Sequence, residues 1–193
     1  MRSTFIATVL LLASMSTAVS QTQRGTWEFS LSGAFSSYSS KSEGSGSTYE
    51  SDPQHVVSLL LRPGYFVIDG LEILPEIYWG ATSDGPPSFS FSGNIAYNYM
   101  IPGSRVAPFV LAGYGIGNGV PVLERMVGRS SDAFDITVLN LGGGAKMFVT
   151  KAVAVTAEYR YQQYGREVTS GSYTTKHTYY FHNVFLGVSF FVP

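Results

Sequence analysis

The chain of 193 residues has no cysteine and few charges. Without cysteine it forms no disulfide, no thiolate metal site, no thiol nucleophile and no lipid anchor on cysteine. Charged residues make up 13% of the chain, about half the share of a soluble domain. The 12 basic residues nearly balance the 13 acidic ones, so there is no electrostatic basis for binding nucleic acid. These absences exclude a disulfide scaffold, a thiol enzyme and a nucleic-acid-binding domain.

What the chain has in excess is aromatic residues and glycine. It contains 13 Tyr, 13 Phe and 21 Gly, and 45% of its residues are hydrophobic. This composition is too apolar and too weakly charged for a disordered chain. Because aromatic residues favour strands, it predicts an ordered all-β protein.

The first twenty residues have the pattern of an export signal. Arg2 precedes an apolar run over 5–13, and residues 18–20 (Ala-Val-Ser) provide a small-x-small cleavage site. The apolar run is too short to span a bilayer as a helix. The sequence therefore predicts a cleaved signal peptide at 1–20 and one barrel domain at 21–193.

The hydrophobic pattern after residue 20 has a period of two. From Val153 to Tyr161, for example, the odd-numbered residues are apolar or aromatic, whereas the even-numbered ones include Glu158. Successive side chains of a strand point to opposite faces, so each such segment has one apolar and one polar face. Eight segments are predicted strands on this basis: 25–37, 54–68, 72–82, 88–101, 106–118, 134–149, 152–164 and 178–191.

The connections between these segments alternate in length. The short ones cover 69–71, 102–105 and 150–151, and the long ones cover 38–53, 83–87, 119–133 and 165–177. An even number of strands joined in this way is typical of an outer-membrane barrel, with the short turns in the periplasm. The sequence thus predicts a closed antiparallel eight-stranded transmembrane β-barrel, an up-and-down meander.

Aromatic residues near the strand ends are expected to form two girdles at the membrane interfaces. The expected periplasmic girdle is Trp27, Phe29, Tyr65, Tyr97, Tyr99, Phe190 and Phe191, and the outer one is Trp79, Phe89, Phe91, Tyr159 and Tyr161.

Charged residues lie on the faces opposite the apolar ones. They are Arg62, Glu72, Glu76, Lys146, Glu158 and Arg160. An eight-stranded barrel is filled by its own side chains, and charges buried there must be paired. If residue 68 faces 72 across its turn, Arg62 lies diagonal to Glu76. If 149 faces 153, Lys146 lies diagonal to Glu158, and diagonal neighbours are within reach of long side chains.

The predicted interior charge network is Arg62, Glu76, Lys146, Glu158 and Arg160. Two interpretations stay open for it. Either the network only pairs the charges that are buried in a closed interior, or it forms an ionic gate in a narrow pore.

Two prolines argue against an uninterrupted ladder of hydrogen bonds in the barrel wall. Pro63 and Pro75 fall inside predicted strands, and proline donates no hydrogen bond to a ladder. A closed barrel has no edge at which to place them, so β-bulges are expected near these residues.

Four segments carry a resemblance to a known family. They are 25–29 (Gly-Thr-Trp-Glu-Phe), 108–115 (Pro-Phe-Val-Leu-Ala-Gly-Tyr-Gly), 157–161 (Ala-Glu-Tyr-Arg-Tyr) and 182–190 (His-Asn-Val-Phe-Leu-Gly-Val-Ser-Phe). The chain resembles the outer membrane protein beta-barrel (porin-like) family, which includes the transmembrane part of outer membrane protein A. The resemblance implies the outer membrane of a Gram-negative bacterium, contact with outer-membrane lipids and lipopolysaccharide, and insertion by the barrel-assembly machinery. It also implies charged pairs inside the barrel, as around Glu158 and Arg160.

No motif points to catalysis, a cofactor or a metal. None of His55, His177 and His182 has serine two residues later, as the deacylase type of lipid A enzyme requires, and no spacing demands a metal. The glycine runs at 113–117 and 142–144 lack the Lys-Ser/Thr and the helix of a phosphate loop. We expect neither an enzyme nor a cofactor.

Three functions stay open. The first is a monomeric barrel with a structural or passive role in membrane integrity, with or without a narrow pore. The second is a surface protein whose loops bind a ligand, including the Ser/Gly-rich segment 36–48, which is expected to have no fixed fold. The third is a soluble lipocalin-like binder with an apolar interior. Alternation alone does not say which face is inside, but the scarcity of charge favours lipid outside.

Overall fold

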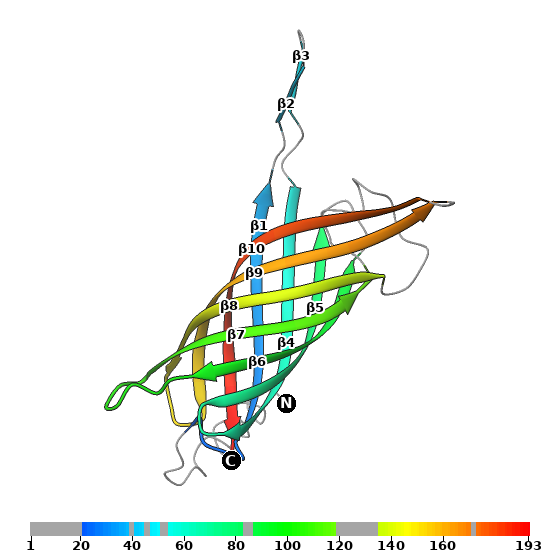
Figure 1. The fold of residues 1–193 in the computed structure, drawn as a ribbon. Helices are drawn as coiled ribbons and strands as arrows, with labels where there is room; N and C mark the ends of the chain where they lie inside the picture. Colours follow the sequence, from blue (N-terminus) through cyan, green and yellow to red (C-terminus); the bar gives the residue numbers. More distant parts are fainter. Residues whose placement is uncertain are drawn as a thin grey trace, which may run out of the picture.

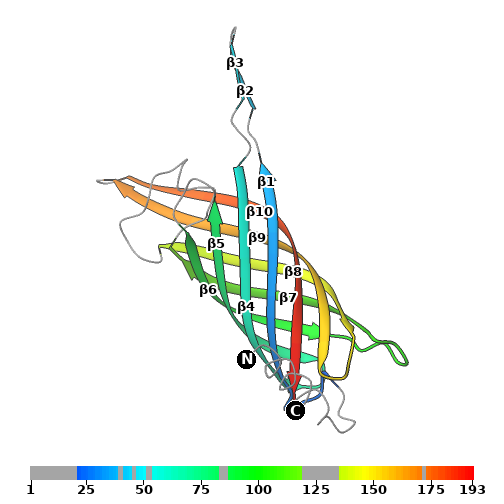
Figure 2. The same ribbon diagram turned by 180° about the vertical axis from the view of Figure 1, so that it is seen from behind.

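The computed structural model describes residues 21–38, 41–44, 47–50, 54–82, 87–118, 135–170 and 173–193. Eight of its strands form a closed barrel in the order β1-β10-β9-β8-β7-β6-β5-β4, which Figures 1 and 2 show from opposite sides. The barrel strands are β1 (Trp27–Tyr38), β4 (Gln54–Ile68), β5 (Leu71–Thr82), β6 (Ser88–Asn98), β7 (Val106–Gly117), β8 (Ile136–Phe148), β9 (Val153–Ser170) and β10 (Tyr173–Val192). All neighbours are antiparallel, so the predicted eight-stranded meander is confirmed.

The structure corrects two predictions about the connections. The segment 36–48, expected to lack a fixed fold, contains β2 (Lys41–Gly44) and the start of β3 (Ser47–Glu50), and these two strands pair antiparallel as a separate hairpin. The predicted connection 165–177 is mostly strand, because β9 and β10 stay paired up to Ser170 and Tyr173. Both errors have one cause. Ladder hydrogen bonds join backbone groups, so a strand can extend through residues that carry no apolar alternation.

The apolar faces of the strands point outward. Leu31 is 55% exposed, Val110 64% and Leu186 63%, whereas Glu28, Glu158 and other even-numbered polar residues are buried inside. A lipocalin-like binder has the opposite distribution, with an apolar interior. Among the described residues, no helix is long and apolar enough to cross a membrane.

Aromatic side chains gather at both ends of the outer face. At the end with the short turns, hereafter the turn end, the ring of Trp27 lies 4.9 Å from that of Tyr65. At the opposite loop end, the hydroxyl of Tyr159 lies 2.6 Å from Nδ1 of His182. Phe191 was wrongly assigned to the girdle. It is buried inside the barrel, because Phe190 and Val192 take the outward positions of the alternation.

The barrel is closed by its first and last strands. Pairing of β1 with β10 runs from Trp27↔Val192 to Gly33↔Leu186, and beyond this point β10 bends away from β1 toward the loop end (Figure 1). On its other side β1 stays paired with β4 as far as Tyr38↔Gln54.

The ladder between β4 and β5 is interrupted at the two prolines. Its pairs Leu61↔Ile77 and Tyr65↔Ile73 set Pro63 opposite Pro75, and no residue pair is formed between them. Neither proline has an N–H to donate, so the ladder cannot continue there. The register shift, between Phe66 and Ile68, lies nearer the turn than the bulge we expected.

Candidate functional site: buried charges across the lumen

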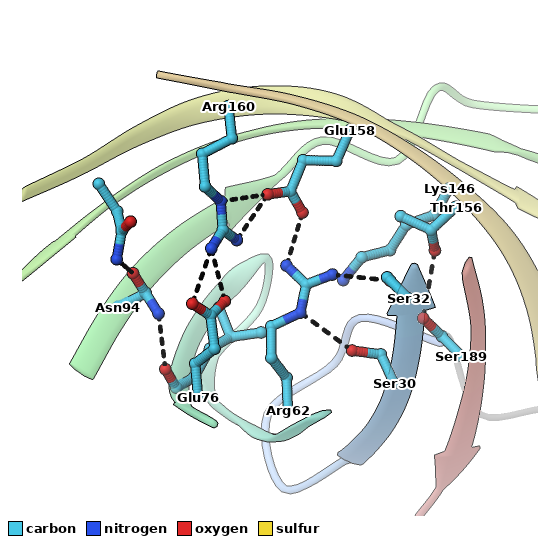
Figure 3. A network of polar contacts seen from close by, with 12 residues as sticks. Ser30, Ser32, Arg62, Glu76, Asn94, Lys146, Thr156, Glu158, Arg160 and Ser189 are labelled. Carbon is cyan, nitrogen blue, oxygen red and sulfur yellow. Dashed lines mark hydrogen bonds and ion pairs between the residues drawn. The ribbon is translucent and has the colours of Figure 1, made fainter. Parts of the chain in front are cut away.

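Four charged side chains form a continuous cluster in the middle of the barrel (Figure 3). Arg62 Nη1 lies 2.5 Å from Glu158 Oε2, and Arg160 Nε donates to Glu158 Oε1 at 2.7 Å. Arg160 Nη1 lies 2.7 Å from both carboxylate oxygens of Glu76. None of these side chains is more than 4% exposed. We call Arg62, Glu76, Glu158 and Arg160 the central cluster, and its two positive and two negative charges cancel.

The wall supports this cluster from several strands. Arg62 on β4 donates from Nε to the Ser30 hydroxyl at 3.2 Å and from Nη2 to the Ser32 hydroxyl at 3.1 Å, both on β1. The guanidinium of Arg160 lies 5.6 Å from the ring centre of Phe185 on β10. Hydrogen bonds and a ring face therefore hold the two guanidinium groups in place.

A second group of charges lies nearer the turn end. Lys146 Nζ lies 2.5 Å from Glu28 Oε2 and 3.0 Å from Glu72 Oε2. Asn98 Nδ2 also donates to Glu72 Oε2, at 3.1 Å. We call Glu28, Glu72 and Lys146 the turn-end cluster, and its formal charge is −1. The ammonium also lies between 5.4 and 5.8 Å from the ring centres of Phe66, Phe109 and Phe191.

The structure brings four of the five predicted residues into direct contact, but with different partners from those we expected. Arg62 contacts Glu158 rather than Glu76, and Lys146 belongs to the turn-end cluster. The register expected for Lys146 is correct, since it pairs with Thr156. The register expected at the other turn is wrong, since Ile68 pairs with Leu71 and Glu72 with Phe66. The partners differ because long side chains cross the narrow lumen instead of reaching along the wall. In the wall, β1 and β10 separate β4 from β9.

Sequence reasoning missed Glu28 as a partner. Its signal was present, because Glu28 lies between the outward residues Trp27 and Phe29 and therefore points inward.

The space around the clusters is filled. Leu74, Ala96, Phe109 and Leu111 pack together beside them. The cavity between the two clusters, which Glu28, Arg62, Glu72, Lys146 and Thr156 help to line, measures about 10 Å³. This is room for about one water molecule.

Side-chain amides form a chain on the loop-end side of the central cluster. Asn140 donates to Asn94 at 3.2 Å, Gln162 to Asn140 at 3.0 Å, and Asn183 to Gln162 at 2.9 Å. Gly113 on β7 lies between the first two, and a Cβ there would collide with the Asn94 amide. Glycine at this position therefore leaves the space that the amide chain needs.

Apolar side chains fill the interior closer to the loop end. Leu60, Tyr78 and Phe185 pack against Ala34, and a neighbouring group contains Ile136, Val138 and Tyr164. Charged, amide and apolar side chains thus share the described part of the lumen, and Phe185 joins the apolar group to the Arg160 guanidinium.

Two of the three histidines have described side chains, and both lie apart from the lumen charges. His55 stacks on Phe35 with ring centres 5.5 Å apart, and His182 contacts Tyr159 on the outer face. His177 lies in β10, and its side chain is outside the described residues. In the part of the chain that the structure describes, no group of three or more His, Asp or Glu residues could hold a metal ion.

A closed barrel with apolar residues outside and paired charges inside is a transmembrane β-barrel. The family model of the outer membrane protein beta-barrel domain matches residues 5–190. The chain belongs to this family and is an outer-membrane protein, so its short turns face the periplasm.

Solved structures share the fold. Neisserial surface protein A is 18% identical, with a TM-score of 0.56, 86% of this chain and 99% of that chain covered. A de novo designed transmembrane β-barrel is 14% identical, with a TM-score of 0.51 and 89% and 99% covered. The N-terminal barrel of OprF from Pseudomonas aeruginosa is 19% identical, with a TM-score of 0.48 and 88% and 98% covered. At such low identity the likeness concerns the fold alone. No curated protein matches the chain in sequence.

Proposed function

We propose that the protein is a closed, monomeric, non-enzymatic barrel that contributes to the integrity of the outer membrane. Its signal peptide at 1–20 is removed on export, the barrel-assembly machinery inserts it, and outer-membrane lipids and lipopolysaccharide surround it. The observation that carries the proposal is the occupied lumen, in which the central and turn-end clusters span the barrel at two levels.

An ion that crossed the barrel would have to separate buried charges. Breaking one buried pair costs about 3–5 kcal/mol, because a charge is left without a partner away from water. In the loop-end part of the lumen that the structure describes, apolar side chains around Leu60 and Val138 occupy the space, and the hydroxyls of Ser58 and Tyr78 that lie there are hydrogen-bonded to each other. This supports a closed barrel over a conducting one.

Conductance separates a closed barrel from a gated pore. We expect no current steps from the purified protein in planar bilayers. We also expect none from the double variant Glu158→Gln/Arg160→Gln, because the two amides still occupy much of the space and the opposite charges of the buried Arg62 and Glu76 still balance. A general porin in the same bilayers is the positive control. Discrete steps in the double variant alone would make the central cluster a gate, and steps in the wild type would refute the closed barrel.

A surface-binding role is the second candidate. The β2–β3 hairpin and the long β9–β10 ladder extend beyond the rest of the barrel at the loop end (Figure 1), and extracellular loops of such barrels carry function. Deleting 39–52 and inserting Asn-Gly before residue 53 removes the hairpin and leaves a three-residue turn between β1 and β4, so all eight barrel strands can stay in place. If the protein mediates adhesion, cells with this deletion bind surfaces less than cells with the full chain at equal outer-membrane amounts, and equal binding removes this role for the hairpin.

A further inference from the structure

The buried charges of the lumen do not balance. Among the described residues, the buried charged side chains are four carboxylates and three positive groups: Glu28, Glu72, Glu76, Glu158, Arg62, Lys146 and Arg160. The central cluster is neutral, and each of its four carboxylate oxygens contacts a guanidinium. The excess negative charge therefore belongs to the turn-end cluster, in which Glu28 and Glu72 share the single ammonium of Lys146.

Glu72 is the carboxylate of this cluster with an unused oxygen. Its Oε2 accepts from Lys146 and from Asn98, whereas its Oε1 has no hydrogen-bond partner, although the residue is 0% exposed. Asn98 Oδ1, on the side chain that donates to Glu72, is also buried without a partner. Glu28 has the shorter contact with the ammonium, 2.5 Å against 3.0 Å for Glu72. Glu72 is therefore the less well compensated of the two carboxylates.

The charged groups that face Glu72 in the described part of the lumen come from three other strands. Lys146 on β8 contacts it, Glu28 on β1 lies within hydrogen-bond reach of its carboxyl group, and Arg62 on β4 lines the same cavity. Arg62 donates to Glu158 and to two serine hydroxyls of β1. Its positive charge is thus already matched within the central cluster, and the turn-end cluster relies on Lys146.

There is little room beside the unused oxygen. A Cβ on Gly64 of β4 would collide with Glu72 Oε1, so the β4 backbone covers this oxygen closely. The adjoining cavity measures about 10 Å³, room for about one water molecule. Metal ions such as Mg²⁺ and Ca²⁺ need about six or more oxygen ligands around them. A proton needs no such space.

We propose that the turn-end cluster binds one proton, which Glu72 carries, and that the lumen of the folded barrel is thereby neutral. A carboxylate that is buried without full pairing is costly, and where two carboxyl groups share a site one of them holds a proton. The neutral acid fits the contacts, because Oε2 as the carbonyl oxygen still accepts from Lys146 and Asn98, and Oε1 becomes a hydroxyl. Glu28 and Lys146 then form a simple ion pair. Two carboxylates only accept hydrogen bonds, so the approach of Glu28 to Glu72 also calls for one proton between them.

Infrared spectroscopy detects this proton, because the C=O stretching band of a carboxylic acid is separate from the bands of carboxylates and amides. The whole barrel is folded into vesicles of ether-linked phospholipid, which has no ester carbonyl. At about pH 6, well above the pKa of about 4.3 of an exposed glutamate, we expect a carboxylic acid band in the wild type. Glu72→Gln, which keeps the shape of the neutral acid, should remove it.

Two further variants separate the proton site from a general effect of charge. Asp69→Asn is the matched control, because it removes an exposed carboxylate of the β4–β5 turn, and it should leave the band unchanged. Glu28→Gln leaves Lys146 and Glu72 as one positive and one negative group. Glu72 should then give up its proton, and the band should disappear although Glu72 is still present. Heat-modified gel mobility confirms that each variant is folded.

The pH dependence of unfolding counts the proton independently. The unfolded chain releases it above about pH 4.3, whereas the folded barrel keeps it, so this contribution to stability is present at low pH and is lost as the pH rises. Between about pH 5 and pH 6, the ratio of the unfolding constant of the wild type to that of Glu72→Gln should rise about tenfold, the effect of one proton.

Four results would overturn the proposal. A wild type without a carboxylic acid band at about pH 6 would mean that the cluster keeps its negative charge. A band that Glu72→Gln leaves intact would place the proton on another residue. A band that disappears when sodium or magnesium chloride is added would make the cluster a metal-ion site. A ratio of unfolding constants that stays the same from pH 5 to pH 6 would show that folding takes up no proton at Glu72.

Discussion

Arg160→Met should destabilise the folded barrel by about 3–5 kcal/mol, the cost of removing one partner of a buried ion pair. Arg160 is fully buried and contacts both Glu76 and Glu158. Its loss leaves two carboxylates to share the single charge of Arg62. The measurement is urea unfolding in phospholipid vesicles, followed by the fluorescence of Trp27 and Trp79, the chain's 2 tryptophans.

The control for this variant is Lys151→Met, which removes an exposed positive charge in the turn between β8 and β9. It should change the unfolding free energy by no more than about 0.5 kcal/mol. The double variant Glu76→Gln/Arg160→Met should recover most of the loss, since Arg62 and Glu158 then form a neutral pair. If Arg160→Met were as mild as the control, the central cluster would be reached by water and the lumen would not be closed.

Gly144→Val should prevent stable closure of the barrel. Gly144 on β8 pairs with Phe109 and Glu158, and a Cβ there would collide with the carbonyl oxygen of Ala157 and lie 2.9 Å from the Cα of Glu158. Because the obstacle is backbone and not a flexible side chain, we expect a loss of about 3 kcal/mol or more, at the upper end for overpacking. The measurement is the fraction of protein that refolds to a heat-modifiable form.

Gly93→Val provides the matched comparison, because it places the same side chain in a strand where nothing lies within 4 Å of the Cβ. A β-branched residue suits a strand, so this variant should fold as well as the wild type. Equal refolding of Gly144→Val and Gly93→Val would show that β8 and β9 can separate at Gly144 without cost.

The sequence was sufficient to predict the barrel because its signal is local. The period-two pattern of β9 depends only on neighbouring residues in the sequence. Glu158 and Arg160 are two residues apart, so both lie on the same face of the strand, regardless of the rest of the chain. The same alternation places Glu28 inside. The prediction of strand bounds failed where backbone pairing extends a strand without an apolar pattern, as beyond Tyr164 in β9.

The ion-pair partners of the buried charges could not be predicted from the sequence. Along the wall, Lys146 lies diagonal to Glu158, the partner that the strand register predicts. The actual partners of Lys146 come from β1 and β5, each three strands away around the barrel. Which carboxylate an ammonium reaches across a lumen depends on barrel diameter, strand tilt and the level of each residue, and none of these is encoded in adjacent residues.

The pairing of the first strand with the last has a consequence for how the protein matures. Trp27↔Val192 and its neighbouring pairs join opposite ends of the domain, so the contacts that complete the wall are the most distant in the chain. Closing so long a loop is entropically the costliest step and is expected late in folding. Until then the molecule is a curved open sheet with β1 and β10 as two free edges, which in a membrane must be shielded. Chain order thus leaves two strand edges to be shielded until the barrel closes, independent of what the finished barrel does.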